Sequence, residues 1–266
     1  MKNWLKLTTF CACLFCFILP LVSCQSRVGP PETPTRTLGD DGGSAAQWLA
    51  QAERLYAERE DLARVRQGIA LLRQARTADS TNYDVMWRLA EFNYYLGAHS
   101  SDGAEQYRAF REGIEAGKLA VKLQDGKPDG HFWLGVNYGG RAKISMLGAL
   151  TAIEDIRHEM DLVIKLDESY EGGSAYMVLG RTYLEAPVWF GRDGQKAIQY
   201  LERGLRFDPR NAITRLSLAK AYLAVNRRED ARKQLDELFA QEPNPAYLPE
   251  YNDTVAEARK LRERLN

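Results

Sequence analysis

Apolar residues recur every three or four positions along most of the chain after Ser44, and this spacing predicts amphipathic α-helices. The pattern is clearest where a leucine is followed by a small residue and, four positions after the leucine, by tyrosine or asparagine. This mark occurs at Leu89-Ala90 with Asn93, Leu134-Gly135 with Tyr138, Leu179-Gly180 with Tyr183, and Leu218-Ala219 with Tyr222. Residues four apart share a helical face, and the small residue lets a neighbouring helix approach closely.

The marked leucines lie 45, 45 and 39 residues apart, so the pattern predicts repeated units of two helices each. The final pair of units is the most regular. Separations of 34 residues relate Ala197 to Ala231, Leu201 to Leu235, and Pro209 to Pro243. Between two helices of this region, Pro209 is expected to end the first and Asn211 to cap the second.

This helix-turn-helix period resembles the tetratricopeptide repeat (TPR). The resemblance covers most of the chain after Ser44 and implies an all-α fold, a TPR-like helical-repeat solenoid of about five helix-turn-helix units. A C-terminal capping helix is expected from Thr254 to Leu265. The first unit is the most degraded and is carried by Trp48, Ala52 and Leu55, then by Leu72 and Ala75.

Three middle units are longer than the repeat requires, by about eleven, nine and five residues, and we expect the extra residues to form loops on one edge of the solenoid. The segments are Gly97 to Gly103, Gly139 to Gly148, and Ala186 to Gly194. Trp189-Phe190 is an aromatic tip that would anchor a partner or, with Met146, line an apolar cavity. The alternative is that Trp189, Ile144 and Leu147 fold back to fill gaps between repeats.

By TPR geometry, the first helix of each unit lines a concave groove. The residues placed there are Trp87, Glu91 and Tyr94, then Phe132, Val136 and Gly139, then Met177 and Arg181. The rings would grip an extended peptide or a hydrophobic ligand, and Arg181 would pair with a carboxylate. Packing between helices is the other explanation for these aromatic residues.

Trp133, Asn137 and Arg141 recur every four residues and share a stripe if their helix continues through Gly139-Gly140. Because glycine weakens a helix, we expect this pair to end the helix or to admit something close to the backbone. Asn137 and Arg141 would then bind a polar group at a mouth. Alternatively, Asn137 satisfies backbone groups and Arg141 pairs with an acid such as Glu154.

The N-terminus reads as a secretory signal, with Lys2 and Lys6 before an apolar stretch and the small residue Ser23 before Cys24. Leu21-Val22-Ser23-Cys24 resembles a bacterial lipobox, which implies cleavage before Cys24 and lipidation of its sulfur and new amine. Several acyl chains anchor a protein to a membrane where one chain is marginal. The remaining cysteines, Cys11, Cys13 and Cys16, lie within the apolar stretch, and a metal cluster there is the weaker interpretation.

The sequence thus divides into a signal peptide over residues 1–23, a lipidated cysteine and flexible tether over 24–43, and the helical repeat domain over 44–266. The tether is rich in proline and glycine and has too few apolar residues to build a core. Gln25 follows the cysteine where, by the sorting rule for such lipoproteins, aspartate would retain the protein in the inner membrane. We therefore expect export to the outer membrane, facing the periplasm.

Charge and residue types argue against nucleic acid and against catalysis. The full chain has 36 basic and 36 acidic residues, and loss of Lys2 and Lys6 leaves 34 basic ones, a net charge of −2. His99, His131 and His158 lack metal-ligand spacing, and no phosphate loop or nucleophile elbow occurs. The acidic and basic run 154–159 is read as a solvated helix face. We expect no enzyme activity, no metal and no cofactor.

The combination of lipobox, proline-rich tether and irregular TPR-like units is similar to a narrower family, the T-component lipoproteins associated with tripartite ATP-independent periplasmic (TRAP) transporters. The segment Phe132 to Gly139 and the Gly-Arg-Asp-Gly turn at 191–194 carry this resemblance. It implies a pore-like cavity and contact with a transporter's substrate-binding protein. Three functions therefore stay open. The first is a scaffold for an envelope protein partner, the alternative is a transporter-associated protein that binds a hydrophobic ligand, and the third is a purely structural envelope protein that binds neither.

Overall fold

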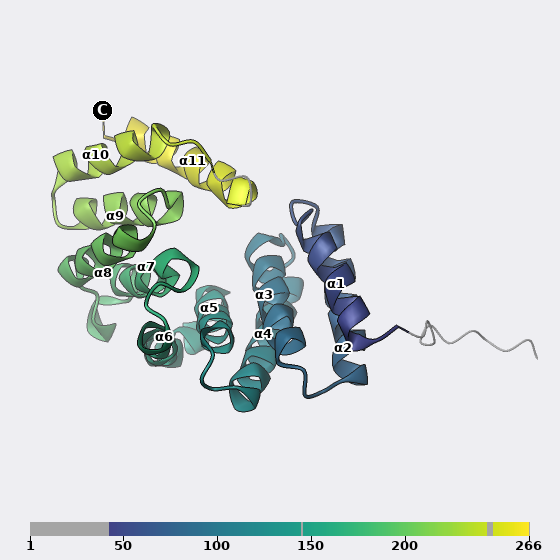
Figure 1. The fold of residues 1–266 in the computed structure, drawn as a ribbon. Helices are drawn as coiled ribbons and strands as arrows, with labels where there is room; N and C mark the ends of the chain where they lie inside the picture. Colours follow the sequence, from purple (N-terminus) through teal and green to yellow (C-terminus); the bar gives the residue numbers. More distant parts are fainter. Residues whose placement is uncertain (1–42, 145, 244–246, 266) are drawn as a thin grey trace, which may run out of the picture. The chain divides into compact units, whose positions relative to one another are not determined.

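The computed structural model describes residues 43–144, 146–243 and 247–265, which belong to one compact unit, Gly42–Asn266. Within these ranges the chain forms α-helices and one short 3-10 helix (η1), with no β-strand (Figure 1). The helices are α1 (Ala45–Tyr56), α2 (Leu62–Ala78), α3 (Tyr83–His99), α4 (Gly103–Leu123), α5 (Pro128–Ile144), α6 (Met146–Leu166), α7 (Tyr170–Glu185), η1 (Val188–Phe190), α8 (Gly194–Phe207), α9 (Ala212–Ala224), α10 (Arg228–Phe239) and α11 (Leu248–Glu263).

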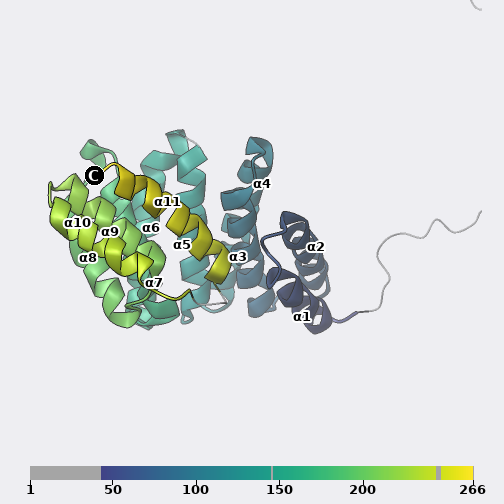
Figure 2. The same cartoon turned by 90° about the horizontal axis from the view of Figure 1, so that it is seen from above.

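The helices pack in chain order as five hairpins, α1/α2, α3/α4, α5/α6, α7/α8 and α9/α10 (Figures 1 and 2). The first helices of successive hairpins also contact one another, α3 with α5, α5 with α7 and α7 with α9. This arrangement confirms the predicted helical-repeat solenoid of five units followed by a further helix.

The repeated leucine and small-residue mark is explained by packing within each hairpin. Leu89, Leu134, Leu179 and Leu218 are all buried. A Cβ atom on Gly135 would lie 2.5 Å from Cε of Met160 in α6, and one on Gly180 would lie 2.5 Å from Cγ of Leu201 in α8. A small residue at these positions lets the two helices of a hairpin approach closely, as the sequence indicates.

The predicted loops at the first two insertions are wrong, because the extra residues lengthen helices instead. Only residues 100–102 separate α3 from α4, and only residue 145 separates α5 from α6. Gly97 and Gly140 lie inside helices and face Phe110, whose ring carbons would be 2.8 and 2.1 Å from an added Cβ. The third insertion is a connection, as expected, and contains η1.

The last helix begins earlier than predicted and connects distant parts of the fold. α11 starts at Leu248 and packs against α9 and α10. Near its start, Glu250 accepts two hydrogen bonds of 2.8 Å from Arg59, which lies between α1 and α2. α11 therefore begins beside the first hairpin and runs back to α10, where Arg262 pairs with Asp236 at 2.9 Å (Figure 2).

Asn211 caps α9, as the sequence predicts, since its Oδ1 accepts a hydrogen bond of 2.9 Å from the backbone N–H of Thr214. The predictions for the lipobox, Cys24 and the tether lie outside the described residues. Among the helices of the described ranges, none has the length and apolar character needed to cross a bilayer.

Candidate binding cavity

A cavity of about 580 Å³ lies between helices α3 to α7, with Ala186 and Pro187 on one side and Ile213 of α9 on another. Its walls are mostly apolar. Aromatic and aliphatic side chains from several different helices face it: Tyr94, Phe110, Phe132, Trp133, Ile156 and Met177. Apolar walls with a few polar groups are typical of small-molecule sites, and this volume is within their usual range.

The wall of the cavity is formed by a connected set of rings. Tyr94 lies 5.9 Å from Trp133 and 6.3 Å from Phe110, measured between ring centroids, and Phe132 meets Trp133 edge-on at 5.2 Å. The glycines of α3 and α5 that face Phe110 let α4 lie close, so the rings sit at the interface of three helices. Nε1 of Trp133 is buried and has no hydrogen-bond partner among the described residues.

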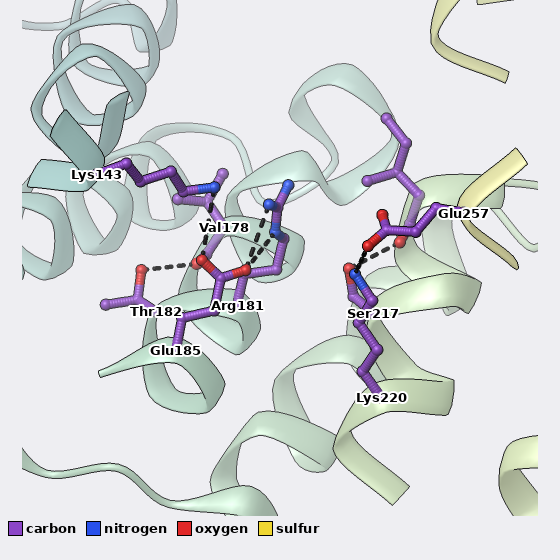
Figure 3. A network of polar contacts seen from close by, with 9 residues as sticks. Lys143, Val178, Arg181, Thr182, Glu185, Ser217, Lys220 and Glu257 are labelled. Atoms are coloured by element: carbon purple, nitrogen blue, oxygen red, sulfur yellow. Dashed lines mark hydrogen bonds and ion pairs between the residues drawn. The ribbon is translucent and has the colours of Figure 1, made fainter. Parts of the chain in front are cut away.

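Charged side chains gather at one edge of this cavity, and Figure 3 shows how they lie relative to one another. Lys143 at the end of α5 places Nζ 3.5 Å from Oε2 of Glu185, and Arg181 donates from Nε and Nη2 to Oε1 of the same carboxylate at 3.3 Å. All three residues line the cavity and keep solvent-exposed surface. We call Lys143, Arg181 and Glu185 the mouth cluster.

The mouth cluster alters the proton affinities of its members. Partial burial, followed by the nearby Arg181 charge, lowers the pKa of Lys143 despite its attraction to Glu185. Burial acts to raise the pKa of Glu185, but Arg181 and Lys143 outweigh it and the net pKa falls. The carboxylate is therefore stabilised in its charged form by two cations.

A second ion pair lies next to the mouth cluster and belongs to α9 and α11 (Figure 3). Lys220 donates to Oε1 of Glu257 at 2.7 Å. One turn earlier in α9, Ser217 donates to the carbonyl of Ile213, which lines the cavity. The last helix thus contributes a charge beside the cavity.

The structure brings together in the cavity six of the residues predicted for the groove: Tyr94, Phe132, Val136, Gly139, Met177 and Arg181. Trp133, predicted for the stripe with Asn137 and Arg141, lines the cavity as well. Trp87 and Glu91 lie elsewhere. The indole N–H of Trp87 donates to Asp84 at 3.0 Å, and Glu91 is buried and accepts a hydrogen bond of 2.7 Å from Arg88.

Asn137 and Arg141 do not form a polar pair at the mouth. Asn137 is fully buried and donates to the carbonyls of Ala90 and Trp133, which corresponds to the backbone-satisfying alternative. Arg141 lies over the ring of Tyr107, 5.3 Å from its centroid. The expected partner Glu154 instead accepts from Arg157 at 2.8 Å, since both are on α6 three residues apart.

The aromatic tip lies outside the cavity wall. Trp189 is 80% exposed and Val188 is 70% exposed, whereas Phe190 is half-buried. Ala186 and Pro187, which precede them, line the cavity in their place. The side chain of Met146 lies outside the described residues. The gap-filling alternative is therefore wrong for Trp189.

Sequence reasoning did not single out Lys143, Glu185 or Phe110. Lys143 lies within a segment that reads as a loop, so the pattern gives no helical face on which to place it. Glu185 is four residues after Arg181, a spacing that predicts a helical ion pair, and this signal was available. Phe110 is one of many apolar residues in α4 and carries no distinguishing mark.

In the described parts of the chain, no three potential metal ligands from histidine, cysteine, aspartate and glutamate come together. His131 is buried, with Nδ1 2.6 Å from Oε2 of Glu159 and Nε2 2.9 Å from the carbonyl of Asp125. The 154–159 run is thus only partly solvated, because Ile156 and its contacts face inward and Glu159 pairs with α5.

Two family descriptions match the sequence of the helical body. The sequence model of the regulator of microtubule dynamics protein 1-3 family matches residues 48–185, and a tetratricopeptide repeat model matches residues 192–261. No curated protein sequence matches the chain.

Solved structures agree on the fold. The thermophilic TPR protein TTC0263 of Thermus thermophilus superimposes with a TM-score of 0.61 at 19% identity, covering 80% of this chain and 98% of its own. PilF of Pseudomonas aeruginosa gives a TM-score of 0.53 at 17% identity, covering 83% and 93% respectively. At these identities the likeness establishes a TPR fold for the helical body.

Proposed function

We propose that this chain, which belongs to the regulator of microtubule dynamics protein 1-3 family, is a lipid-anchored, non-catalytic TPR scaffold that binds a protein partner in the cell envelope. The microtubule role in that description belongs to the proteins it names. For this chain we propose only that its stacked helical hairpins recognise a protein partner, as TPR proteins do.

The observation that carries this proposal is the exposed tip Val188-Trp189 on a braced connection. Arg192 donates from Nε to the carbonyl of Ala186 at 2.8 Å, and Gly191 adopts the left-handed conformation with φ of 83°. Because the backbone of this connection is braced, ordering it on binding would cost little conformational entropy. Tryptophans are enriched among residues that dominate binding energy.

Substitution of the tip tests the scaffold proposal. We expect Trp189→Ala to weaken binding of the partner captured by crosslinking in intact cells by about tenfold or more, as for interface hot spots. Because the ring is exposed, thermal stability should stay unchanged. Tyr107→Ala, which removes a ring 43% exposed on α4, is the matched control. Equal capture by wild type and both variants would rule out the tip as the anchor.

The anchor is proposed from the sequence at Cys24. Acylation there would attach the body to the outer membrane, facing the periplasm, through a tether whose root-mean-square reach is roughly 25 Å. Mass analysis of the N-terminal peptide tests this directly. An acylated peptide beginning at Cys24 is expected, and an unmodified peptide containing Met1 would exclude the anchor.

The apolar cavity favours a second candidate function, binding of a hydrophobic small molecule in a TRAP T-component-like protein. Gly139 lines the cavity with room for a larger side chain, because the nearest atom to an added Cβ is 3.7 Å away on Ile156. Gly139→Leu should occupy part of the cavity and weaken binding of the neutral fluorescent probe N-phenyl-1-naphthylamine. Gly103→Leu, at an open position, should bind the probe normally. Unchanged binding by Gly139→Leu would exclude the cavity.

A further inference from the structure

The charges at the mouth of the cavity do not balance. Lys143 and Arg181 share the single carboxylate of Glu185, so the mouth cluster carries one net positive charge. The neighbouring cation Lys220 is already paired with Glu257 at 2.7 Å. The cavity edge therefore offers two cationic donors to an incoming anion and only one competing acid.

The geometry of the two cations suits a carboxylate. Arg181 uses Nε and Nη2 on one oxygen of Glu185 at 3.3 Å, which is longer than a strong charge-assisted hydrogen bond. Lys143 is 3.5 Å from the other oxygen. These long contacts leave donor capacity for a second anion between the two side chains. Burial and the neighbouring cations also lower the pKa of Lys143, a cost that a second anion would offset.

Below the mouth, the cavity offers an apolar enclosure. Phe132, Ile156 and Met177 line it. An apolar chain would fill this enclosure and remove these side chains from water.

We infer that the cavity binds an amphipathic monocarboxylate, with its carboxylate between Lys143 and Arg181 and its apolar body against the Phe132 and Met177 wall. The inference rests on the second candidate function, binding of a hydrophobic ligand, and adds the charge and orientation of that ligand. A volume of about 580 Å³ is ample for an eight-carbon acid.

Titration calorimetry with two probes of equal chain length tests the inference. The full chain in lipid nanodiscs would be titrated with octanoate and with octan-1-ol, and empty nanodiscs would correct for partition into lipid. Octanoate should bind about tenfold or more tightly than the alcohol, the scale of a hydrogen bond to a charged group. Arg181→Gln and Lys143→Gln should each reduce this preference.

Two further variants sharpen the result. Glu185→Gln removes the competing carboxylate and should tighten octanoate binding without affecting octan-1-ol. Lys122→Gln, an exposed lysine at the end of α4, is the matched control and should change neither affinity. Equal binding of octanoate and octan-1-ol would overturn the inference and leave the hydrophobic-ligand function standing. Binding of neither probe would overturn both.

Discussion

Two adjacent glycines in α5 make different contacts, and they give a test of packing at the scale of one methyl group. A Cβ on Gly140 would lie 2.1 Å from Phe110, whereas one on Gly139 would have its nearest neighbour at 3.7 Å. We expect Gly140→Ala to lower the free energy of unfolding by about 1–3 kcal/mol through overpacking. Gly139→Ala should be neutral or stabilise by up to about 1 kcal/mol through helix propensity. Urea denaturation measures both, and equal losses would contradict the packing described for Phe110.

Glu91 is a buried acid that should make the stability of the fold depend on pH. Burial raises its pKa to about 7, although Arg88 and the more distant Arg59 oppose the shift and Glu171 adds to it. The folded protein therefore holds this proton more tightly than the unfolded chain, for which the ordinary value is 4.5. Stability from this group is fully present below pH 4.5 and is lost as the pH rises to about 7.

Glu91→Gln removes that titration. Relative to wild type, the variant should gain on the order of 2 kcal/mol in free energy of unfolding between about pH 5 and about pH 8. Urea denaturation of both proteins at the two pH values gives this difference. The contributions of all other titrating groups are the same in the two proteins and cancel when the variant is compared with wild type. A stability difference independent of pH would show that Glu91 stays ionised in its pair with Arg88.

At the scale of helices, sequence periodicity predicted the elements well because burial of one face dictates the spacing of leucines and small residues. It failed where glycines occur inside helices. The pair Gly139-Gly140 reads as a helix break. In the structure the helix continues, and the ring of Phe110 packs against it at Gly140, where there is no side chain in the way. That ring is 29 residues or more away in the sequence, so local propensity does not contain the reason.

Near the start of α11, an enclosed ion pair links this helix to the first hairpin, and the pair makes a prediction for the whole helix. The Arg59 side chain is 9% exposed and forms two hydrogen bonds with Glu250, beside the rings of Tyr56 and Tyr95. Arg59→Met should cost about 3 kcal/mol, as expected when one partner of a buried pair is removed. It should also expose α11 to trypsin through local unfolding.

The matched control is Arg66→Met, which removes a pair of the same geometry with Glu105 whose arginine is 48% exposed. This exposed pair should contribute less than about 1 kcal/mol. If both variants lose the same stability and α11 is cleaved no faster in Arg59→Met, the Arg59–Glu250 pair does not hold the helix.

At the scale of the whole molecule, the sequence predicted some residues of the candidate site but not others. TPR geometry placed Tyr94, Phe132 and Arg181 on first helices facing a common groove, and the structure brings them together. The same geometry placed Trp87 and Glu91 there, but local pairs with Asp84 and Arg88 hold them elsewhere. Lys143 joins the site because α5 continues past Gly140, which the sequence pattern does not predict.

We propose a membrane-held helical body that binds an organic acid, and one measurement tests the anchor and the ligand together. Native mass spectrometry of the wild-type chain, released gently from its own membrane, gives the N-terminus, the covalent lipid and any bound molecule together. We predict a chain beginning at Cys24, acylated, with a non-covalent organic acid that is lost in Arg181→Gln. A mass equal to the unmodified 266-residue chain with nothing bound would contradict the account.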